Sequence, residues 1–154
     1  MAMQIVRRAT AGWTGSDSAG SGTIALGSGA FEGAYSLRSR VGDERHTNPE
    51  ELIGAAVAGC FTMSLANKLT EDGAEVVQLE TSAATRMAGG DGGFSITEVA
   101  MTLTAKVRGA SVERVEELAR QAHESCPVAR ALAGTNVTLT VRAEVTDSAV
   151  GAAQ

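Results

Sequence analysis

A long apolar helix near the middle of the chain limits the folds open to this sequence. Asn48 is a suitable N-cap residue and Pro49 suits the first helical position, so a helix is expected to begin here and to run to Asp72. Its segment LIGAAVAGCF, at 52–61, is apolar on every face and must be buried on most sides. A monomer of 154 residues seldom encloses a helix about 36 Å long, so a second chain is expected to cover it.

The rest of the chain is predicted to form strands and two shorter helical segments. Ser111 caps an amphipathic helix over 112–122, and a short helical segment runs from Cys126 to Leu132. Apolar and polar residues alternate in the other segments, which is the period of a half-buried strand. The expected strands cover 4–9, 23–26, 31–41, 76–87, 94–107 and 137–145. This order predicts an α+β, largely antiparallel fold, with one domain over 1–147 and a flexible C-terminal tail over 148–154.

Composition excludes several classes of partner. The net charge of −5 disfavours nonspecific nucleic-acid binding and an anionic membrane surface, and with 3% aromatic residues a base-stacking platform is hard to assemble. Two cysteines are too few for a secreted disulfide scaffold. The first residues lack the apolar segment of a signal peptide, and the apolar stretch over 52–65 is shorter than a membrane span. We therefore expect a cytoplasmic protein that binds neither nucleic acid nor membrane.

The two cysteines are the first candidates for chemistry, although a buried free cysteine is often only a small apolar side chain. Cys126 stands directly before Pro127, at a helix start, where backbone N–H groups favour a thiolate. Cys60 lies in the apolar helix, where burial disfavours a thiolate. If Cys60 is a nucleophile it needs a cation, and Arg38 or Arg40, shortly before the helix, can supply it.

A buried arginine would need a carboxylate, and Glu50 and Glu51 are the nearest in sequence. Glu50 precedes Cys60 by ten residues, about 15 Å along a helix. Its action at Cys60 would require a sharp bend or the partner chain's copy, and an ordinary role in the first helical turn also remains open. No metal site is expected, because the cysteines with His46 and His123 lack ligand spacing.

Two motifs resemble those of the OsmC/Ohr family, the osmotically induced and organic-hydroperoxide-resistance proteins. The segment TNPEELIGAAVAGCF, at 47–61, is similar to the family's first cysteine motif, and Cys-Pro-Val, at 126–128, is similar to its second. The separation of the motifs and the order of the elements also match, so the resemblance covers almost the whole chain. It implies an OsmC-like fold in which two chains intertwine as a homodimer around a long central helix, with active sites at the subunit interface.

The resemblance also implies an activity and four site residues. The protein would be a thiol-dependent peroxidase for organic hydroperoxides, with Cys60 as the peroxidatic thiolate and Cys126 as the resolving thiol. Arg40 would stabilise the thiolate, and Glu50 would hold the guanidinium. The Ohr branch places its arginine near the first hairpin, whereas the hairpin at 15–22 here has none, which favours the OsmC branch. Val57 departs from the family pattern, which often has a histidine or tyrosine there.

No bound cofactor or metal is implied; an external dithiol, of the lipoyl type, would reduce the disulfide. The apolar residues around Cys60 favour organic hydroperoxides over hydrogen peroxide, although the same residues could simply form the core. Two other classes of function remain open. One is a non-catalytic dimeric stress protein that binds an apolar small molecule, and the other is a thiol redox sensor that passes its oxidation to a partner.

Overall fold

The computed structural model describes residues 3–146, and the chain divides into two compact units, Met1–Leu52 and Ile53–Gln154. The predicted tail over 148–154 lies outside the described residues. One domain over 1–147 stays a prediction.

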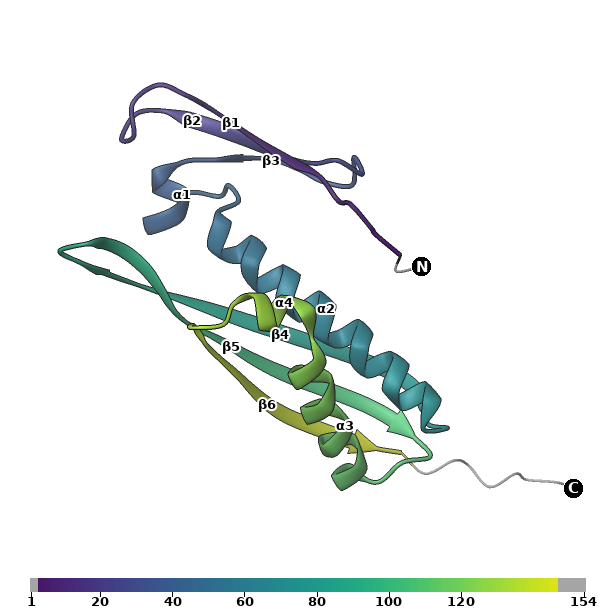
Figure 1. Ribbon diagram of the computed structural model, residues 1–154. Helices are drawn as coiled ribbons and strands as arrows, with labels where there is room; N and C mark the ends of the chain where they lie inside the picture. The colour runs from purple at the N-terminus through teal and green to yellow at the C-terminus, as the bar shows by residue number, and fades with distance from the viewer. Residues whose placement is uncertain (1–2, 147–154) are drawn as a thin grey trace, which may run out of the picture. The chain divides into compact units, whose positions relative to one another are not determined.

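The first unit contains a three-stranded antiparallel sheet and a short helix (Figure 1). The strands β1 (Ala9–Thr14), β2 (Ser21–Leu26) and β3 (Glu32–Tyr35) pair in chain order. The prediction for the first strand, 4–9, was wrong, because the hairpin pairs Thr14 with Ser21 and therefore requires the strand to run up to the turn. The first strand therefore lies closer to the glycine-serine loop than the sequence pattern predicts.

The predicted strand over 31–41 was also wrong in its second half. The strand ends at Tyr35, and α1 (Leu37–Val41) follows it. Ser36 and Ser39 form a reciprocal capping box: the Ser39 N–H donates to Ser36 Oγ at 3.1 Å, and the Ser36 N–H donates to Ser39 Oγ at 3.0 Å. These side-chain bonds stabilise a helical turn where the apolar alternation alone favours a strand.

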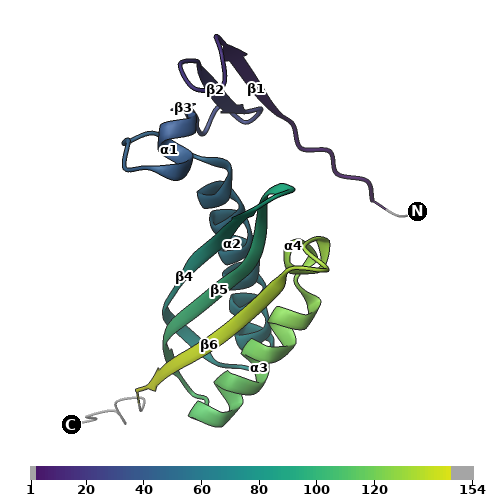
Figure 2. The same ribbon diagram turned by 90° about the vertical axis from the view of Figure 1, so that its left-hand side faces the viewer.

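The second unit is a three-stranded sheet with helices on one face (Figures 1 and 2). The strands β4 (Glu75–Gly90) and β5 (Gly93–Arg108) form an antiparallel hairpin, and β6 (Asn136–Val145) pairs with β5 in parallel. The connection from β5 to β6 contains α3 (Val112–Ser125) and α4 (Pro127–Ala131). These helices carry the chain back to the end of the sheet where β5 begins, so β6 runs parallel to β5. The α+β class is confirmed.

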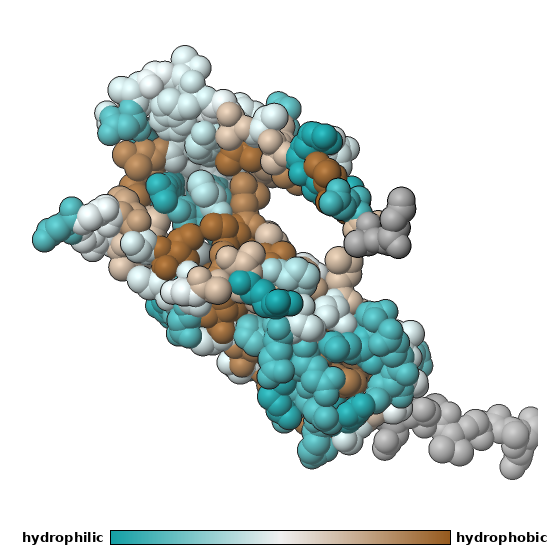
Figure 3. Space-filling model, viewed as in Figure 1, coloured by the Kyte–Doolittle hydropathy of each residue, from teal (hydrophilic) through white to brown (hydrophobic). Residues whose placement is uncertain are grey.

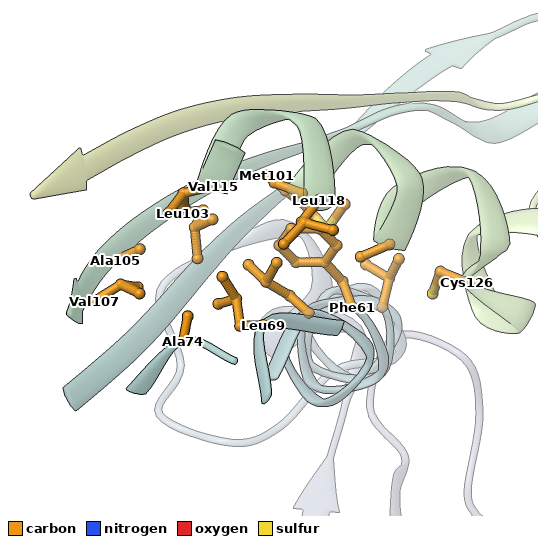
Figure 4. Packing of buried hydrophobic residues seen from close by; sticks show 14 of the residues in the cluster. Phe61, Leu69, Ala74, Met101, Leu103, Ala105, Val107, Val115, Leu118 and Cys126 are labelled. Carbon is orange, nitrogen blue, oxygen red and sulfur yellow. The ribbon is translucent and has the colours of Figure 1, made fainter. Parts of the chain in front are cut away.

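The hydrophobic core lies between this sheet, α3 and the long helix α2 (Pro49–Glu71), most of which belongs to the second unit. Figure 4 shows Phe61 and Leu69 of α2 directed toward Met101 and Leu103 of β5. The predicted apolar alternation of β5 is confirmed, since its odd positions from 99 to 107 are all buried. The apolar side of α3 closes the core, and Figure 3 shows hydrophilic residues gathered over its outer side.

The helix α2 is long and apolar enough, by length and composition alone, to cross a membrane. In this structure one of its faces packs against the sheet, with Val57, Phe61, Leu65 and Leu69 fully buried. That face of α2 is part of the hydrophobic core. Another face carries small and apolar residues that stay exposed within the single chain, among them Met63 at 73% exposure.

Candidate active site

The two predicted site cysteines come together in the second unit. Cys60 lies on α2 and is half-buried, whereas Cys126 lies between α3 and α4 and is fully buried. Although the two cysteines are 66 positions apart, the Cys60 thiol lies close enough to Cys126 to raise the pKa of the Cys126 thiol. Both are free thiols. Cys126 closes one end of the core cluster, as Figure 4 shows, and Cys60 packs against that same cluster.

The backbone around Cys126 positions its sulfur. Cys126 is the C-cap residue of α3 and the N-cap residue of α4, and its Sγ accepts a hydrogen bond from the Ala129 N–H at 3.5 Å. Pro127 occupies the first position of α4, as expected for a residue without an N–H. The cysteine motif therefore places the thiol at the junction of two helices.

Burial is the main influence on the Cys126 thiol and raises its pKa. The Ala129 N–H opposes this effect, and the neighbouring Cys60 thiol adds to it. The sequence-based expectation that the N-cap position favours a thiolate therefore needs correction, because desolvation outweighs the N–H groups. Burial therefore works against a thiolate at Cys126.

The other two predicted residues, Arg40 and Glu50, form an ion pair in the first unit. Arg40 Nε donates to Glu50 Oε1 at 2.9 Å, and Arg40 Nη2 lies 2.8 Å from the same oxygen. Glu50 is buried, whereas 38% of the Arg40 side chain is exposed. A buried carboxylate thus holds a guanidinium that is still open to solvent.

The start of α2 fixes this pair. Asn48 caps the helix as predicted, with its Oδ1 accepting from the Glu51 N–H at 2.8 Å. The amide of Asn48 also donates to the Ser39 carbonyl of α1 at 3.2 Å. The cap residue of α2 thereby ties α1, which carries Arg40, to the first turn of α2, which carries Glu50.

A cavity of about 360 Å³ lies in the first unit, and both aromatic and polar residues line it. Trp13 and Tyr35 line it together with Arg40, and sequence reasoning noted these aromatic residues only as too few for nucleic-acid stacking. The sequence feature that could have indicated this pair is that Trp13 and Tyr35 lie on either side of the glycine-serine loop. The residues around the cavity are Trp13, Asp17, Tyr35, Ser36, Leu37, Arg40 and Pro49.

The structure describes both histidines of the chain. His46 Nδ1 lies 3.5 Å from a carboxylate oxygen of Glu44, and His123 Nδ1 is buried without a hydrogen-bond partner among residues 3–146. Over the same residues, no three side chains of histidine, cysteine, aspartate or glutamate converge as a metal site would require. The candidate chemistry therefore concerns the thiol pair and the ion pair.

Comparison with known proteins matches both sequence and fold. A family model described as "OsmC-like protein" matches residues 42–142. Peroxiredoxin OsmC of Escherichia coli K12 is 35% identical over 131 residues, which cover 84% of this chain and 92% of the relative. Organic hydroperoxide resistance protein OhrB of Bacillus subtilis is 34% identical over 89 residues, covering 57% of this chain and 63% of the relative. The fuller match to the OsmC relative agrees with the predicted branch.

Solved structures share the fold. An OsmC-like protein of unknown function from Vibrio cholerae has a TM-score of 0.75 at 19% identity, over 90% of this chain and 100% of the other. An organic hydroperoxide resistance protein from Elizabethkingia anophelis has a TM-score of 0.70 at 23% identity, over 92% of this chain and 100% of the other. The family model and the identity to the E. coli relative together show that this chain belongs to the OsmC-like protein family.

Proposed function

We propose that the protein is a thiol-dependent peroxidase that reduces organic hydroperoxides, with Cys60 as the peroxidatic and Cys126 as the resolving residue. The observation that carries the proposal is that two thiols 66 positions apart in the chain lie near each other at one core cluster. The printed names of the relatives, a peroxiredoxin and organic hydroperoxide resistance proteins, support the same activity.

The proposed cycle is a two-electron reduction. The Cys60 thiolate attacks the outer oxygen of the hydroperoxide, the O–O bond breaks, and the organic oxygen leaves as the alcohol after protonation. Cys60 is then a sulfenic acid. The sulfur of Cys126 attacks the sulfur of Cys60, a disulfide forms, and water leaves. An external dithiol, proposed to be of the lipoyl type, reduces the disulfide and is itself oxidised.

Burial raises the pKa of Cys126, so its sulfur must give up a proton as it attacks the sulfenic acid in the second step. Because the thiol remains protonated until it reacts, its proton is available for the hydroxide that leaves the sulfenic acid. The Ala129 N–H, which already donates to the sulfur, would stabilise negative charge that develops there during the attack. A buried resolving thiol also has little reactivity toward other oxidants.

We assign Arg40 to the Cys60 thiolate and to the charge that develops on the peroxide, with Glu50 as the residue that positions the guanidinium. Ten residues of α2 separate Glu50 from Cys60, about 15 Å of helix. We therefore assign the ion pair of each chain to the Cys60 of the other chain, in a homodimer. The apolar face of α2 that stays exposed within one chain supports dimer formation.

A steady-state assay with cumene hydroperoxide and dihydrolipoamide tests this function. Wild-type protein should turn over many times, and Cys60→Ser should be inactive. Mixing Cys60→Ser chains with Arg40→Met chains in equal amounts should restore about a quarter of the wild-type activity, since half of all dimers are then mixed and each mixed dimer holds one complete site of two. Absence of turnover with wild-type protein would contradict the peroxidase, and absence of rescue would contradict the shared site.

The same assay separates the other functions left open by the sequence. A redox sensor would consume one peroxide per chain and then stop, and a binding protein would hold an apolar ligand equally well after Cys60→Ser. We also propose a cytoplasmic location, because a reducing compartment returns the thiols to the active state. Cell fractionation tests the location.

A further inference from the structure

The only tryptophan and the only tyrosine of the chain form a pair on the sheet of the first unit. Their ring centroids are 5.4 Å apart, with an angle of 53° between the ring planes. The strand register places Trp13 opposite Gly22 and Gly22 opposite Tyr35. The rings therefore meet across a central glycine, in one row that crosses all three strands.

Gly22 is required for this row. A Cβ atom at Gly22 would lie 2.5 Å from a ring carbon of Tyr35, which is closer than side-chain contacts allow. The absent side chain thus provides the space that the tyrosine ring fills. The indole N–H of Trp13 donates to the Gly15 carbonyl at 3.0 Å, so its polar atom is satisfied while 40% of the residue stays exposed.

The aromatic pair lines the cavity of about 360 Å³ that also contains Arg40. This volume lies within the usual range for small-molecule sites, roughly 300–1,000 Å³. The charged groups on its wall are Arg40, which is ion-paired with Glu50, and the carboxylate of Asp17. The surroundings therefore carry no excess positive charge, and they suit an uncharged apolar group better than an anion.

We propose that this aromatic cavity binds the uncharged organic group of the hydroperoxide, an arene above all, and releases it as the alcohol. The proposal rests on the peroxidase function and adds a specificity site to it. Arg40 would lie beside the polar end of the ligand, and the rings of Trp13 and Tyr35 would contact its apolar end. The aromatic rings stack with arenes at offset or edge-to-face geometry.

A binding experiment tests the cavity without turnover. Because Trp13 is the only tryptophan, its fluorescence in full-length Cys60→Ser protein reports directly on the cavity. Titration with cumyl alcohol, the product of cumene hydroperoxide, should change this emission and saturate. Tyr35→Ala should weaken the binding by about tenfold, and Tyr35→Phe, which keeps the ring, should stay within about twofold.

A kinetic experiment supplies the second measurement. In the chain with both cysteines, Tyr35→Ala should lower the ratio of kcat/KM for cumene hydroperoxide to kcat/KM for hydrogen peroxide by about tenfold. The matched control is Phe94→Ala, which removes an exposed aromatic ring from the β4–β5 hairpin of the second unit and should leave that ratio unchanged. Circular dichroism verifies that both variants fold.

The outcomes separate the two proposals. Saturable binding of cumyl alcohol in a protein that proves to have no peroxidase activity would support the cavity and refute the function. Turnover without a change in Trp13 emission, or with an unchanged kinetic ratio in folded Tyr35→Ala, would refute the cavity and leave the function standing.

Discussion

Oxidation of the reduced protein with one equivalent of hydroperoxide is expected to join Cys60 to Cys126 and to stabilise the fold. The cross-link closes a loop of 66 positions, which in the chain-entropy model raises the free energy of unfolding by about 4 kcal/mol. The sulfur of Cys126 would lose its S–H and accept more weakly from the Ala129 N–H, at a cost of about 1 kcal/mol. The net gain is about 3 kcal/mol.

Urea unfolding followed by circular dichroism measures this gain. With an m-value of about 2 kcal/mol/M, the midpoint of the oxidised protein should lie about 1.5 M above that of the reduced protein. Dithiothreitol should reverse the shift, and mass spectrometry should show the loss of two hydrogens. Cys126→Ser carried through the same treatment should show neither change.

The reasoning is refuted if the wild-type protein keeps both hydrogens after one equivalent of hydroperoxide. That result would mean that the two sulfurs do not react together, although they lie close to each other. It is refuted equally if the disulfide forms and the midpoint does not rise, because the loop length would then have no effect on the unfolded chain.

Three further predictions use the same residues and the core. Arg40→Met should slow the alkylation of Cys60 by iodoacetamide at pH 7 by about tenfold, while Arg38→Met, which removes an exposed cation two positions away, should leave the rate unchanged. Because the pKa of Cys126 is raised in the folded protein, unfolding releases the Cys126 proton once the pH exceeds the thiol's ordinary pKa of 9.0. Between pH 9.0 and the folded-state pKa, the free energy of unfolding of the reduced protein should therefore fall by about 1.4 kcal/mol per pH unit. This pH dependence should be absent in Cys126→Ala. Phe61→Ala, at a fully buried position, should lower the free energy of unfolding by about 3–5 kcal/mol in urea titration, against under 1 kcal/mol for Phe94→Ala on the exposed hairpin.

The elements that the sequence predicted correctly have strong local signals. Asn48 and Pro49 determine where α2 begins, and Gly73 determines where it ends, because its φ of 86° is readily adopted only by glycine. The alternation in β5 is equally local, since every second residue faces the core. In these segments propensity, capping and burial all favour the same structure.

Residues 37–41 show why other elements could not be predicted. Leu37, Ser39 and Val41 alternate with two arginines, which is compatible with a strand, yet the same five residues form one helical turn. The capping box between Ser36 and Ser39 and the hydrogen bond from Asn48 to the Ser39 carbonyl decide between the two. The last of these bonds joins residues nine positions apart, so no local pattern contains it.

In the candidate site, too, the sequence predicts some features and not others. The cysteine motifs identify Cys60 and Cys126, but the closeness of their thiols depends on how α3 packs on the core that it shares with α2. The aromatic cavity was missed because it depends on strand register. A shift of one residue in either hairpin would move Trp13 or Tyr35 to the other face of the sheet, and the sequence around the glycine-serine loop does not specify that register.

The thiol pair and the ion pair belong to different units of the chain, so the two halves of the proposed mechanism can fail separately. Disulfide formation needs only Cys60 and Cys126, whereas rapid attack on the peroxide also needs the guanidinium of Arg40. An Arg40→Met protein that still forms the disulfide, slowly and in full yield, would show that the ion pair governs the rate of the first step. Loss of the disulfide itself in that variant would instead mean that Arg40 maintains the fold around the thiols, and the catalytic assignment of Arg40 would then be wrong.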